Sequence, residues 1–596
     1  MKGVTSGVGS LSFSVQAVCR ASVMDSWFFK AKSFMQFLHT NACAQCGARC
    51  HSLRRHVAAV LFLGLLGGVL VPQSVSAEAG QGLLLEELRD GRIGPLQPSI
   101  DLDLDVPSVS DQHPGGEQVR IDEVQFDGHS VFTEEQLREV LGDYAGEPFD
   151  LSGLHGLAAR ITRFYRQQGY PFATALLPEQ TISDNTLTIR VLEGRYGRVE
   201  AIDYDQFAEP AQAYLASLVP GDVIERRALE RTMLILGDVP GIVATPAMRP
   251  GEETGTGDLG VEVEPAPQVR GGVRMDNHGN RFSGAYRGQV DLAANRLLMF
   301  GDELTLRAFY TDEDLWLGDL AYSLPLGTSG LRGEVGVART EYALGEDLLG
   351  LEGTATIGSA TLTYPFIRQE TGNLIGILGY EYKALDDQFL GQSFDEKTVQ
   401  SGSLGVRFDR RDGILGGGVT YGAAVLSGGD VSPTDDIAAF GEAPGDGGFA
   451  KLLLQLTRQQ RLPAGFVLEL SGMVQRADGE LDSSEFMTLG GAGGVRAFPQ
   501  GEAAGSEAAL LQSELSYQIG WGLTPFVFHD VGRVRAEDSA PQGGGRTISG
   551  AGLGLRGNWG QMSAEVVSAW EGAGGPPQAD QRNQDPRVWG RVGYRF

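Results

Sequence analysis

The most constraining feature of the chain is an alternation of apolar and polar side chains that fills its carboxyl-terminal half. From residue 269 to residue 596, segments of about ten residues alternate in polarity between turns rich in Gly, Asp, Asn and Pro. Leu306 and Tyr310 share one face of such a segment, and Arg307 lies on the other. Strands with one side in lipid and one in water carry this pattern. The alternation therefore predicts a transmembrane antiparallel β-barrel over residues 268–596.

The last predicted strand shows the alternation most clearly. Val588, Val592 and Phe596 share one face, whereas Arg587 and Arg591 share the opposite face. At roughly 20 residues for each strand and its turn, the region holds about 16 strands. A soluble β-sandwich or barrel is the alternative, and the terminal aromatic residue, the inward arginines and a secretion signal disfavour it.

Length, glycine content and charge narrow the class of protein further. With 596 residues the chain is too long for one hydrophobic core, which predicts three or more domains. Its 85 glycines disfavour a helical protein, because glycine lowers helix stability and suits turns. A formal net charge of -28 would repel phosphates, so no nucleic-acid partner is expected.

A secretion signal is predicted over residues 1–77. Two arginines precede an apolar run at 57–71, which is shorter than the roughly 20 residues that a spanning helix needs. Small residues follow the run, so cleavage is expected between Ala77 and Glu78. The stretch before the arginines is long for a signal, and translation is therefore expected to start downstream of the first residue, near Met35.

The cysteines all lie within this signal, at Cys19, Cys43, Cys46 and Cys50. The predicted mature chain has none, which suits an oxidising periplasm and leaves no disulfide framework. Cys43 and Cys46 have the spacing of one pair of metal ligands, but the second pair that a structural zinc site needs is missing. We therefore expect neither a metal nor another cofactor.

A helix and a linker are predicted over residues 78–117. Residues 82–92 (GLLLEELRDGR) combine leucines with mixed charge, which suits a short helix, and an acidic stretch with several prolines follows.

A small α/β domain is predicted next, over residues 118–195. A strand near 119–126 carries Glu123 as an extra residue, which indicates a β-bulge. Thr133 and Gln136 then form a capping box that opens a helix.

A second helix and a closing strand at 187–191 give this domain the order β-α-α-β, with a further strand expected around 173–177. The same order recurs more weakly over residues 196–267, where helices are expected at 210–218 and 225–236. Two tandem α/β domains are the simplest interpretation.

Catalytic motifs are absent from the sequence. It has no Walker A loop, no HExxH and no GxSxG, and the glycines around Gly552 suit a barrel strand better than a phosphate loop. We therefore expect no enzyme activity.

Three motif blocks resemble those of a known family of transporters. Residues 169–172 (GYPF), 177–180 (LPEQ) and 191–194 (VLEG) are similar to the first POTRA domain of the two-partner secretion transporters. These are the TpsB type, which includes the haemolysin and haemagglutinin secretion/activation proteins. Residues 275–279 (MDNHG) resemble the DNxG opening of that family's first barrel strand. The resemblance extends over the whole predicted mature chain.

The strongest block is GGAGGVRAFPQGE at residues 490–502, which resembles a loop that these transporters fold into the barrel. The usual core of this motif is VRG followed by Tyr or Phe. Here the core is Val495, Arg496, Ala497 and Phe498. Because alanine resists a positive φ where glycine does not, this departure bears on the local backbone conformation.

Phe528, Asp530 and Gly532 resemble the F-x-D-x-G strand motif of the same family, whose aspartate points into the lumen. The resemblance implies that Asp530 pairs with Arg496. An unpaired desolvated arginine would be costly, and a forked guanidinium–carboxylate pair could pin the loop. Such a pair could stabilise the barrel, act in the transport cycle, or do both.

The resemblance implies an outer-membrane translocation pore that exports, and thereby activates, a large haemolysin-, haemagglutinin- or adhesin-like partner. Two periplasmic POTRA domains would bind the unfolded partner by edge-strand addition. The helix at 82–92 would plug the resting pore, or would be a surface helix without a gating role. Tyr594 and Phe596 would form the signal by which the barrel-assembly machinery inserts the chain into outer-membrane lipid. Folding of the partner outside would supply the energy.

Two other classes of function share parts of this pattern. An outer-membrane barrel-assembly factor has the same kind of barrel and the same arginine loop, and a passive porin or barrel enzyme has the barrel alone. Periplasmic domains disfavour a porin. Two POTRA-like units preceded by a helix and a linker favour export over assembly.

Overall fold

The computed structural model describes residues 94–96, 117–202, 206–343, 350–434, 447–535, 545–580, 582 and 584–596. The expected secretion signal, with Ala77 and Glu78, and the expected helix at 82–92 lie outside the described residues. None of the helices that are described is long and apolar enough to cross a membrane.

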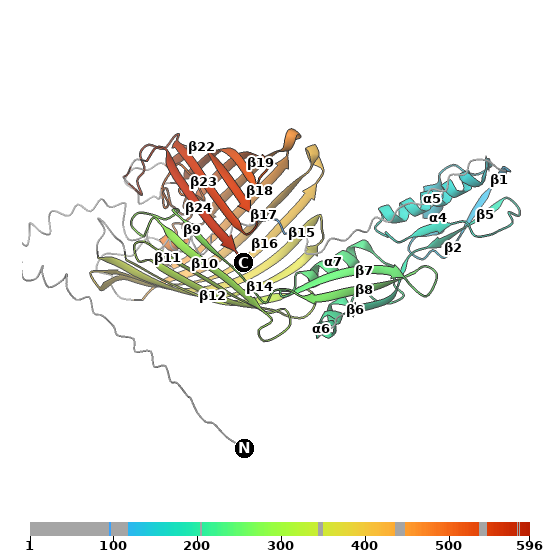
Figure 1. Ribbon diagram of the computed structural model, residues 1–596, viewed down its shortest axis with the longest axis horizontal. Coiled ribbons are helices and arrows are strands. Elements are labelled where there is room, and N and C mark those ends of the chain that lie inside the picture. Colours follow the sequence, from blue (N-terminus) through green and yellow to red (C-terminus); the bar gives the residue numbers. More distant parts are fainter. Residues whose placement is uncertain are drawn as a thin grey trace, which may run out of the picture. The chain divides into compact units, whose positions relative to one another are not determined.

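The first α/β unit places two helices against small sheets (Figure 1). Its elements are β1 (Val119–Ile121), β2 (Glu123–Asp127), α4 (Glu134–Leu141), β3 (Glu147–Phe149), α5 (Leu151–Gln167), β4 (Thr174–Leu176) and β5 (Thr186–Leu192). The main sheet has the order β2-β5-β4, in which β2 is parallel to β5 and β4 is antiparallel to it. The additional strand expected around 173–177 is thus present as β4.

The strand expected near 119–126 is two strands rather than one bulged strand. β1 pairs with β3, whereas β2 pairs with β5. The chain changes partners at Asp122, whose backbone N–H donates to the carbonyl of Asn185 (2.9 Å). The bulge prediction was wrong because the short β3, which takes β1 as its partner, has no periodic pattern of its own.

Local sequence accounts for the helices of this unit. Thr133 caps α4, and its side chain accepts from the N–H of Gln136 while the Gln136 side chain accepts from the N–H of Thr133. In α5, Leu157, Ile161 and Tyr165 recur at helical spacing and are almost completely buried. This apolar stripe forms the core between helices and sheet.

The second unit repeats the architecture with β6 (Arg195–Ile202), α6 (Ala208–Leu215), α7 (Arg226–Gly237), β7 (Ile242–Pro250) and β8 (Thr256–Pro265). Its sheet order is β6-β8-β7, again with one parallel and one antiparallel pair. The sequence did not reveal β7, because Pro246 and Pro250 interrupt it. Both prolines are tolerated because β7 lies at an edge of the sheet.

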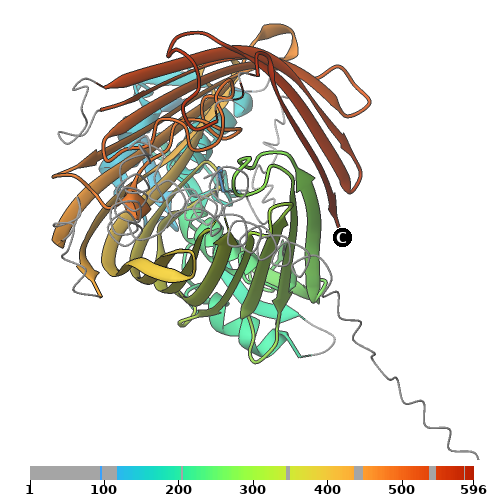
Figure 2. The ribbon, with the colours of Figure 1, turned by 90° about the vertical axis from the view of Figure 1, so that its left-hand side faces the viewer.

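Sixteen antiparallel strands then close into a barrel in which β24 pairs with β9 (Figure 2). The strands are β9 (Val269–Asp276), β10 (Arg287–Asn295), β11 (Glu303–Thr311), β12 (Trp316–Pro325), β13 (Arg332–Ala343), β14 (Leu351–Arg368), β15 (Gly372–Phe389), β16 (Gln392–Asp412), β17 (Gly418–Pro433), β18 (Gly447–Arg461), β19 (Phe466–Ala477), β20 (Ala508–Tyr517), β21 (Leu523–Val534), β22 (Arg546–Trp559), β23 (Met562–Glu571) and β24 (Arg587–Arg595). The predicted barrel and its strand number are confirmed.

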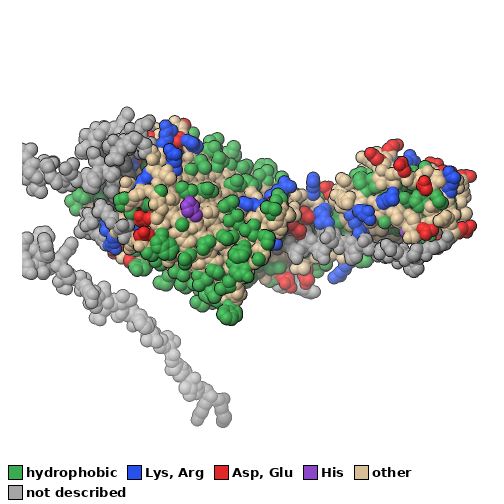
Figure 3. All heavy atoms as spheres, turned by 90° about the horizontal axis from the view of Figure 1, so that it is seen from above, with side chains coloured by type: hydrophobic (Ala, Val, Ile, Leu, Met, Phe, Trp, Pro, Cys, Tyr) green, Lys and Arg blue, Asp and Glu red, His purple; other side chains and the backbone are tan. Residues whose placement is uncertain are grey.

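The two faces of the barrel strands separate as the alternation predicts. On β24, Val588 and Val592 are about half exposed, whereas Arg587 and Trp589 are buried. Figure 3 shows hydrophobic side chains gathered over the outer surface of the barrel. An apolar outer face and a polar inner face are what a barrel in a bilayer requires.

Candidate functional site

The connection between β19 and β20 folds inward instead of extending into solvent. Val495, Ala497 and Phe498 are fully buried in it. They form an apolar cluster with inward residues of the barrel wall, including Phe526 and Phe528 of β21. The motif at 490–502 is therefore a loop packed against the inside of the barrel.

Arg496 at the tip of this loop is fastened to Asp530 of β21. Its Nε and Nη2 donate to the two carboxylate oxygens of Asp530, each at 2.8 Å, and its backbone N–H donates to the same carboxylate at 3.1 Å. A fourth contact joins Nη1 to Glu514 of β20 at 3.1 Å. Arg496 is 7% exposed and Asp530 is fully buried, so the pair is largely shielded from bulk water. We call Arg496, Asp530 and Glu514 the tip anchor.

The F-x-D-x-G motif places three consecutive inward positions of β21 around the tip anchor. The Cζ atom of Arg496 lies 3.5 Å from the ring centre of Phe528, a cation–π contact. A Cβ on Gly532 would lie 3.1 Å from a methyl group of Leu489 and 3.2 Å from one of Val495. Residues i, i+2 and i+4 of a strand share one face. The loop therefore meets the ring of Phe528, the carboxylate of Asp530 and the space left by Gly532 on the same side of β21.

Ala497 replaces the common glycine without adopting a positive φ; it is absent from the described residues that have one. Its side chain faces Gly550 of β22, where an added Cβ would lie 2.3 Å from the Cβ of Ala497. The loop has alanine where glycine is common, and the glycine that makes room for it is Gly550 on the facing strand β22.

The final strand also holds the loop. The Nε1 atom of Trp589 donates to the Arg496 carbonyl at 2.7 Å. Tyr594 and Phe596 lie on the outward face, half exposed, with their rings stacked. The backbone of Phe596 exchanges two hydrogen bonds with Gly271, which helps to close the barrel.

Sequence patterns missed Glu514. It faces inward on β20 and bridges Arg496 to Arg556 of β22, which also pairs with Glu565 of β23. The alternation of β20 places Glu514 on the inner face, but only strand register identifies its partners.

In the first α/β unit, the VLEG motif supplies a buried carboxylate. Glu193 accepts hydrogen bonds from the N–H groups of Ser130 (2.6 Å) and Val131 (2.8 Å) and from the hydroxyl of Tyr165 (3.1 Å). Burial alone would raise its pKa, but the hydrogen bonds that Ser130 and its neighbour donate hold the pKa of Glu193 below its ordinary value. This residue fastens the turn after β2 to the end of β5, directly before the second unit begins.

Comparison with known proteins agrees with this geometry. The profile of the family described as "Haemolysin secretion/activation protein ShlB/FhaC/HecB" matches residues 255–557, and that of the ShlB-type POTRA domain matches residues 119–194. The chain belongs to the ShlB/FhaC/HecB family.

Several known proteins are similar to this chain. The heme/hemopexin transporter protein HuxB of Haemophilus influenzae strain 86-028NP is 28% identical over 393 residues, which cover 65% of this chain and 69% of HuxB. The outer membrane transporter CdiB of Dickeya dadantii is 23% identical and covers 67% of this chain and 72% of its own length. The solved structure of CdiB from Escherichia coli matches with a TM-score of 0.66 at 19% identity, covering 87% of this chain and 98% of that one.

Family membership establishes the function in outline. The ShlB/FhaC/HecB protein is an outer-membrane transporter of a two-partner secretion system, and it exports a partner protein. Its POTRA domain lies in the periplasm. The export prediction is confirmed.

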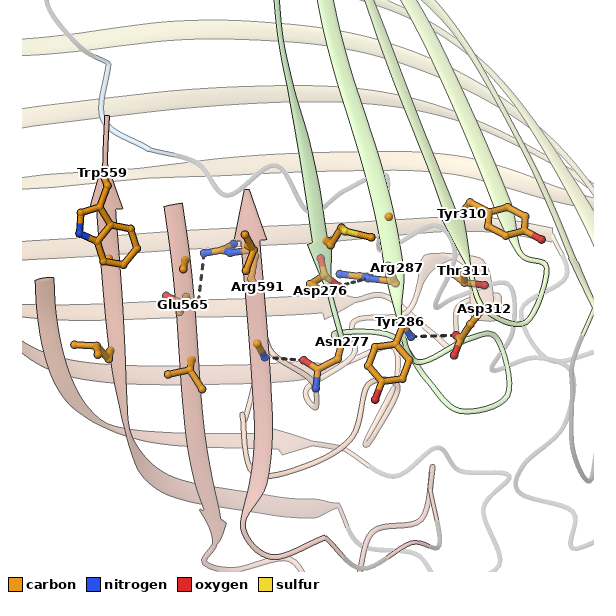
Figure 4. Close-up of a pocket in the computed structure, with 18 of the residues that line it drawn as sticks. Asp276, Asn277, Tyr286, Arg287, Tyr310, Thr311, Asp312, Trp559, Glu565 and Arg591 are labelled. Carbon is orange, nitrogen blue, oxygen red and sulfur yellow. Dashed lines mark hydrogen bonds and ion pairs between the residues drawn. The ribbon is translucent and has the colours of Figure 1, made fainter. Parts of the chain in front are cut away.

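The DNxG motif of the transporter lies at the seam where β24 meets β9. Asp276 pairs with Arg287 at 2.7 Å. Asn277 accepts from the N–H of Gly590 at 2.6 Å (Figure 4). It also donates to the Val588 carbonyl at 2.9 Å. Because β24 and β9 share only five residue pairs, these side-chain contacts extend a short seam.

A groove of about 1020 Å³ lies over this seam. Met275, Tyr286, Tyr310 and Trp559 line it, and each is about half exposed or more; Figure 4 shows the two tyrosines and the tryptophan. An apolar groove on the outer surface of a membrane barrel is part of its lipid-facing side.

Proposed function

We propose that the transporter receives a large haemolysin-, haemagglutinin- or adhesin-like partner, unfolded, at two periplasmic POTRA domains. These are the α/β units at 118–195 and 196–267, and they pass the partner into the barrel at 268–596. The partner supplies energy by folding outside, and no catalytic step is assigned to the transporter. Barrel-assembly machinery inserts the barrel into outer-membrane lipid, guided by the strand that ends with Tyr594 and Phe596.

The open edge of β2 carries the partner-binding part of this proposal. Within the described part of the chain, β2 pairs with β5 alone, and Glu123, Gln125 and Asp127 are exposed along it. A free strand edge presents main-chain donors and acceptors that an extended peptide can complete. By contrast, the Gln212 side chain bonds to the backbone of Val199 and Ala201 on β6, so the corresponding edge of the second unit is already occupied.

Co-expression with the large secreted protein encoded beside this transporter tests the proposal. We expect that protein in the medium only when the transporter is present, and we expect export to fail when residues 118–195 are deleted although the barrel still inserts. Release without the transporter would contradict the proposal. Misassembly of other outer-membrane proteins in its absence would favour an assembly factor instead.

We further propose that the segment at 82–92 is a helix that plugs the resting pore. Residues 94–96 of the adjoining linker contact the wall of the barrel, which supports this role. Arg407 of β16 donates to the carbonyl of Gly94 at 2.6 Å, Arg411 donates to the carbonyl of Leu96 at 2.6 Å, and the N–H of Leu96 donates to Asp409 at 3.3 Å.

Deletion of residues 82–92 should raise ion conductance in planar bilayers relative to the intact chain. Unchanged conductance would contradict a plug and leave a surface helix.

A further inference from the structure

A second group of buried charges holds the loop at a place distant in sequence from its tip. A turn of 3-10 helix, η4 (Ser483–Glu485), begins the inward part of the connection and is capped by Asp482. Asp482 and Glu485, which we call the root acids, face lysines from the barrel wall. The lysines are Lys383 of β15, Lys397 of β16 and Lys451 of β18.

Direct ion pairs join the two groups. Lys397 lies 2.7 Å from Asp482, and Lys451 lies 2.5 Å from the second oxygen of Glu485. Lys383 pairs with the first oxygen of Glu485. The Glu485 carbonyl accepts from Lys451 at 3.2 Å and from the Gln475 amide at 3.0 Å, so the backbone of the turn is fixed together with its side chain.

Burial distinguishes this cluster from ordinary surface pairs. The side chains of Lys383 and Glu485 are each 3% exposed, and those of Lys397 and Asp482 are 7% and 6% exposed. Burying so many charges costs free energy unless geometry and pairing compensate for it. The pairing is extensive, because Asp395 also contacts Lys397 at 2.9 Å and Glu381 lies 3.6 Å from Lys383, so each lysine faces at least one carboxylate.

The root contacts and the tip anchor use different strands. The root acids bind β15, β16 and β18, whereas Arg496 binds β20 and β21. The loop is therefore fixed to two separate parts of the wall.

We infer that Lys383, Lys397 and Lys451, together with the root acids, form a second anchor that positions the loop for transport and keeps its root inside the barrel when the tip anchor opens. The residues of this root anchor position the loop for transport. The inference rests on the proposed function of the barrel as an export pore. With it, loss of the Arg496–Asp530 pair releases the tip without expelling the whole loop.

A cysteine at position 484 reports the root directly. Ser484 is 1% exposed, and its hydroxyl has no hydrogen-bond partner among the described residues, so Ser484→Cys removes no hydrogen bond. The sequence contains no cysteine after Cys50. In the purified full chain, the rate of reaction of this thiol with a polar maleimide therefore measures exposure of the root, with the chain lacking the reporter as the blank.

Three variants carrying the reporter decide the question. Arg496→Ala should change the labelling rate by no more than twofold. Adding Glu485→Gln should raise the rate at least tenfold, and Glu485→Asp, which keeps the charge, should restore most of the protection. The matched control combines Arg496→Ala with Glu341→Gln, which alters an exposed ion pair with Arg339 on β13. Its labelling rate should equal that of Arg496→Ala alone.

The root anchor is refuted if Arg496→Ala alone exposes the thiol tenfold, or if adding Glu485→Gln leaves it protected. Heat-modifiable gel migration verifies that each barrel is folded, and Asp482→Asn replaces Glu485→Gln if the latter fails to fold. Labelling needs no partner protein, so its outcome is independent of export. Loss of export with normal labelling would count against the proposed partner alone.

Discussion

The first α/β unit buries mainly apolar side chains, whereas the barrel buries apolar and charged side chains together. In the unit, Ile161 and Leu187 are almost completely buried, and Glu193 is a carboxylate placed among them. In the barrel, Leu404 is 64% exposed on the outer face while Asp530 is fully buried inside. The unit in water thus depends mainly on apolar burial, whereas the barrel in lipid adds charge pairs buried on its inner side. An exposed apolar side chain is therefore favourable where the surrounding solvent is lipid and unfavourable where it is water.

The largest expected effect is that of Arg496→Ala in the barrel. Removing the arginine leaves Asp530 buried without its partner, which should cost about 3–5 kcal/mol of stability locally. We expect export to fall while the barrel still inserts, as judged by heat-modifiable gel migration. Arg339→Ala is the control, because that exposed pair contributes about 0–1 kcal/mol. Export at the normal level would show that the tip anchor has no part in transport.

Because the two regions face different solvents, replacing a large apolar side chain by alanine should destabilise them by different amounts. Ile161→Ala in α5 should destabilise the first unit by about 2–5 kcal/mol, because it leaves a cavity in a packed core. Leu404→Ala should cost less, because lipid fills the space on the outer face. Hydrogen exchange of the full chain in each region measures both effects. Equal losses would break the comparison.

A smaller effect is expected at the barrel seam. Asn277→Ala removes two hydrogen bonds to the backbone of β24 and leaves the N–H of Gly590 and the carbonyl of Val588 without that partner. The expected loss is about 1–3 kcal/mol. It should appear as a lower temperature of barrel unfolding on gels, while hydrogen exchange in the α/β units stays unchanged. An unaltered unfolding temperature would mean that the side chain does not hold the seam.

The smallest effect is expected for Glu193, the buried carboxylate of the first unit, and it appears in the pH dependence of stability. Because the folded pKa of Glu193 is lowered, its stabilising contribution is complete above its ordinary pKa and disappears as pH falls through the lowered value. Hydrogen exchange in the first unit should therefore accelerate with falling pH in that acidic range, beyond the intrinsic change. The Glu193→Gln chain should lack this component. An identical pH profile in both chains would assign the acid sensitivity elsewhere.

Sequence patterns predicted the elements with a strong period and missed those without one. The stripe of α5, the Thr133 cap and the alternation of β24 were all visible. The strands β3 and β7 were not, because β3 has no periodic pattern of its own and β7 contains prolines. For the site, family motifs led to Arg496 and Asp530, which the structure brings together.

By itself, the sequence determined which side chains share a face and where helices begin, because these depend on periodicity and on neighbours within a few residues. The length of the barrel region indicated about 16 strands. Only the tertiary structure decided which charges meet. Lys383 and Glu485 are 102 positions apart, and Asn277 meets Gly590 across 313. Such contacts depend on barrel closure and strand register, which are set by all the strands together.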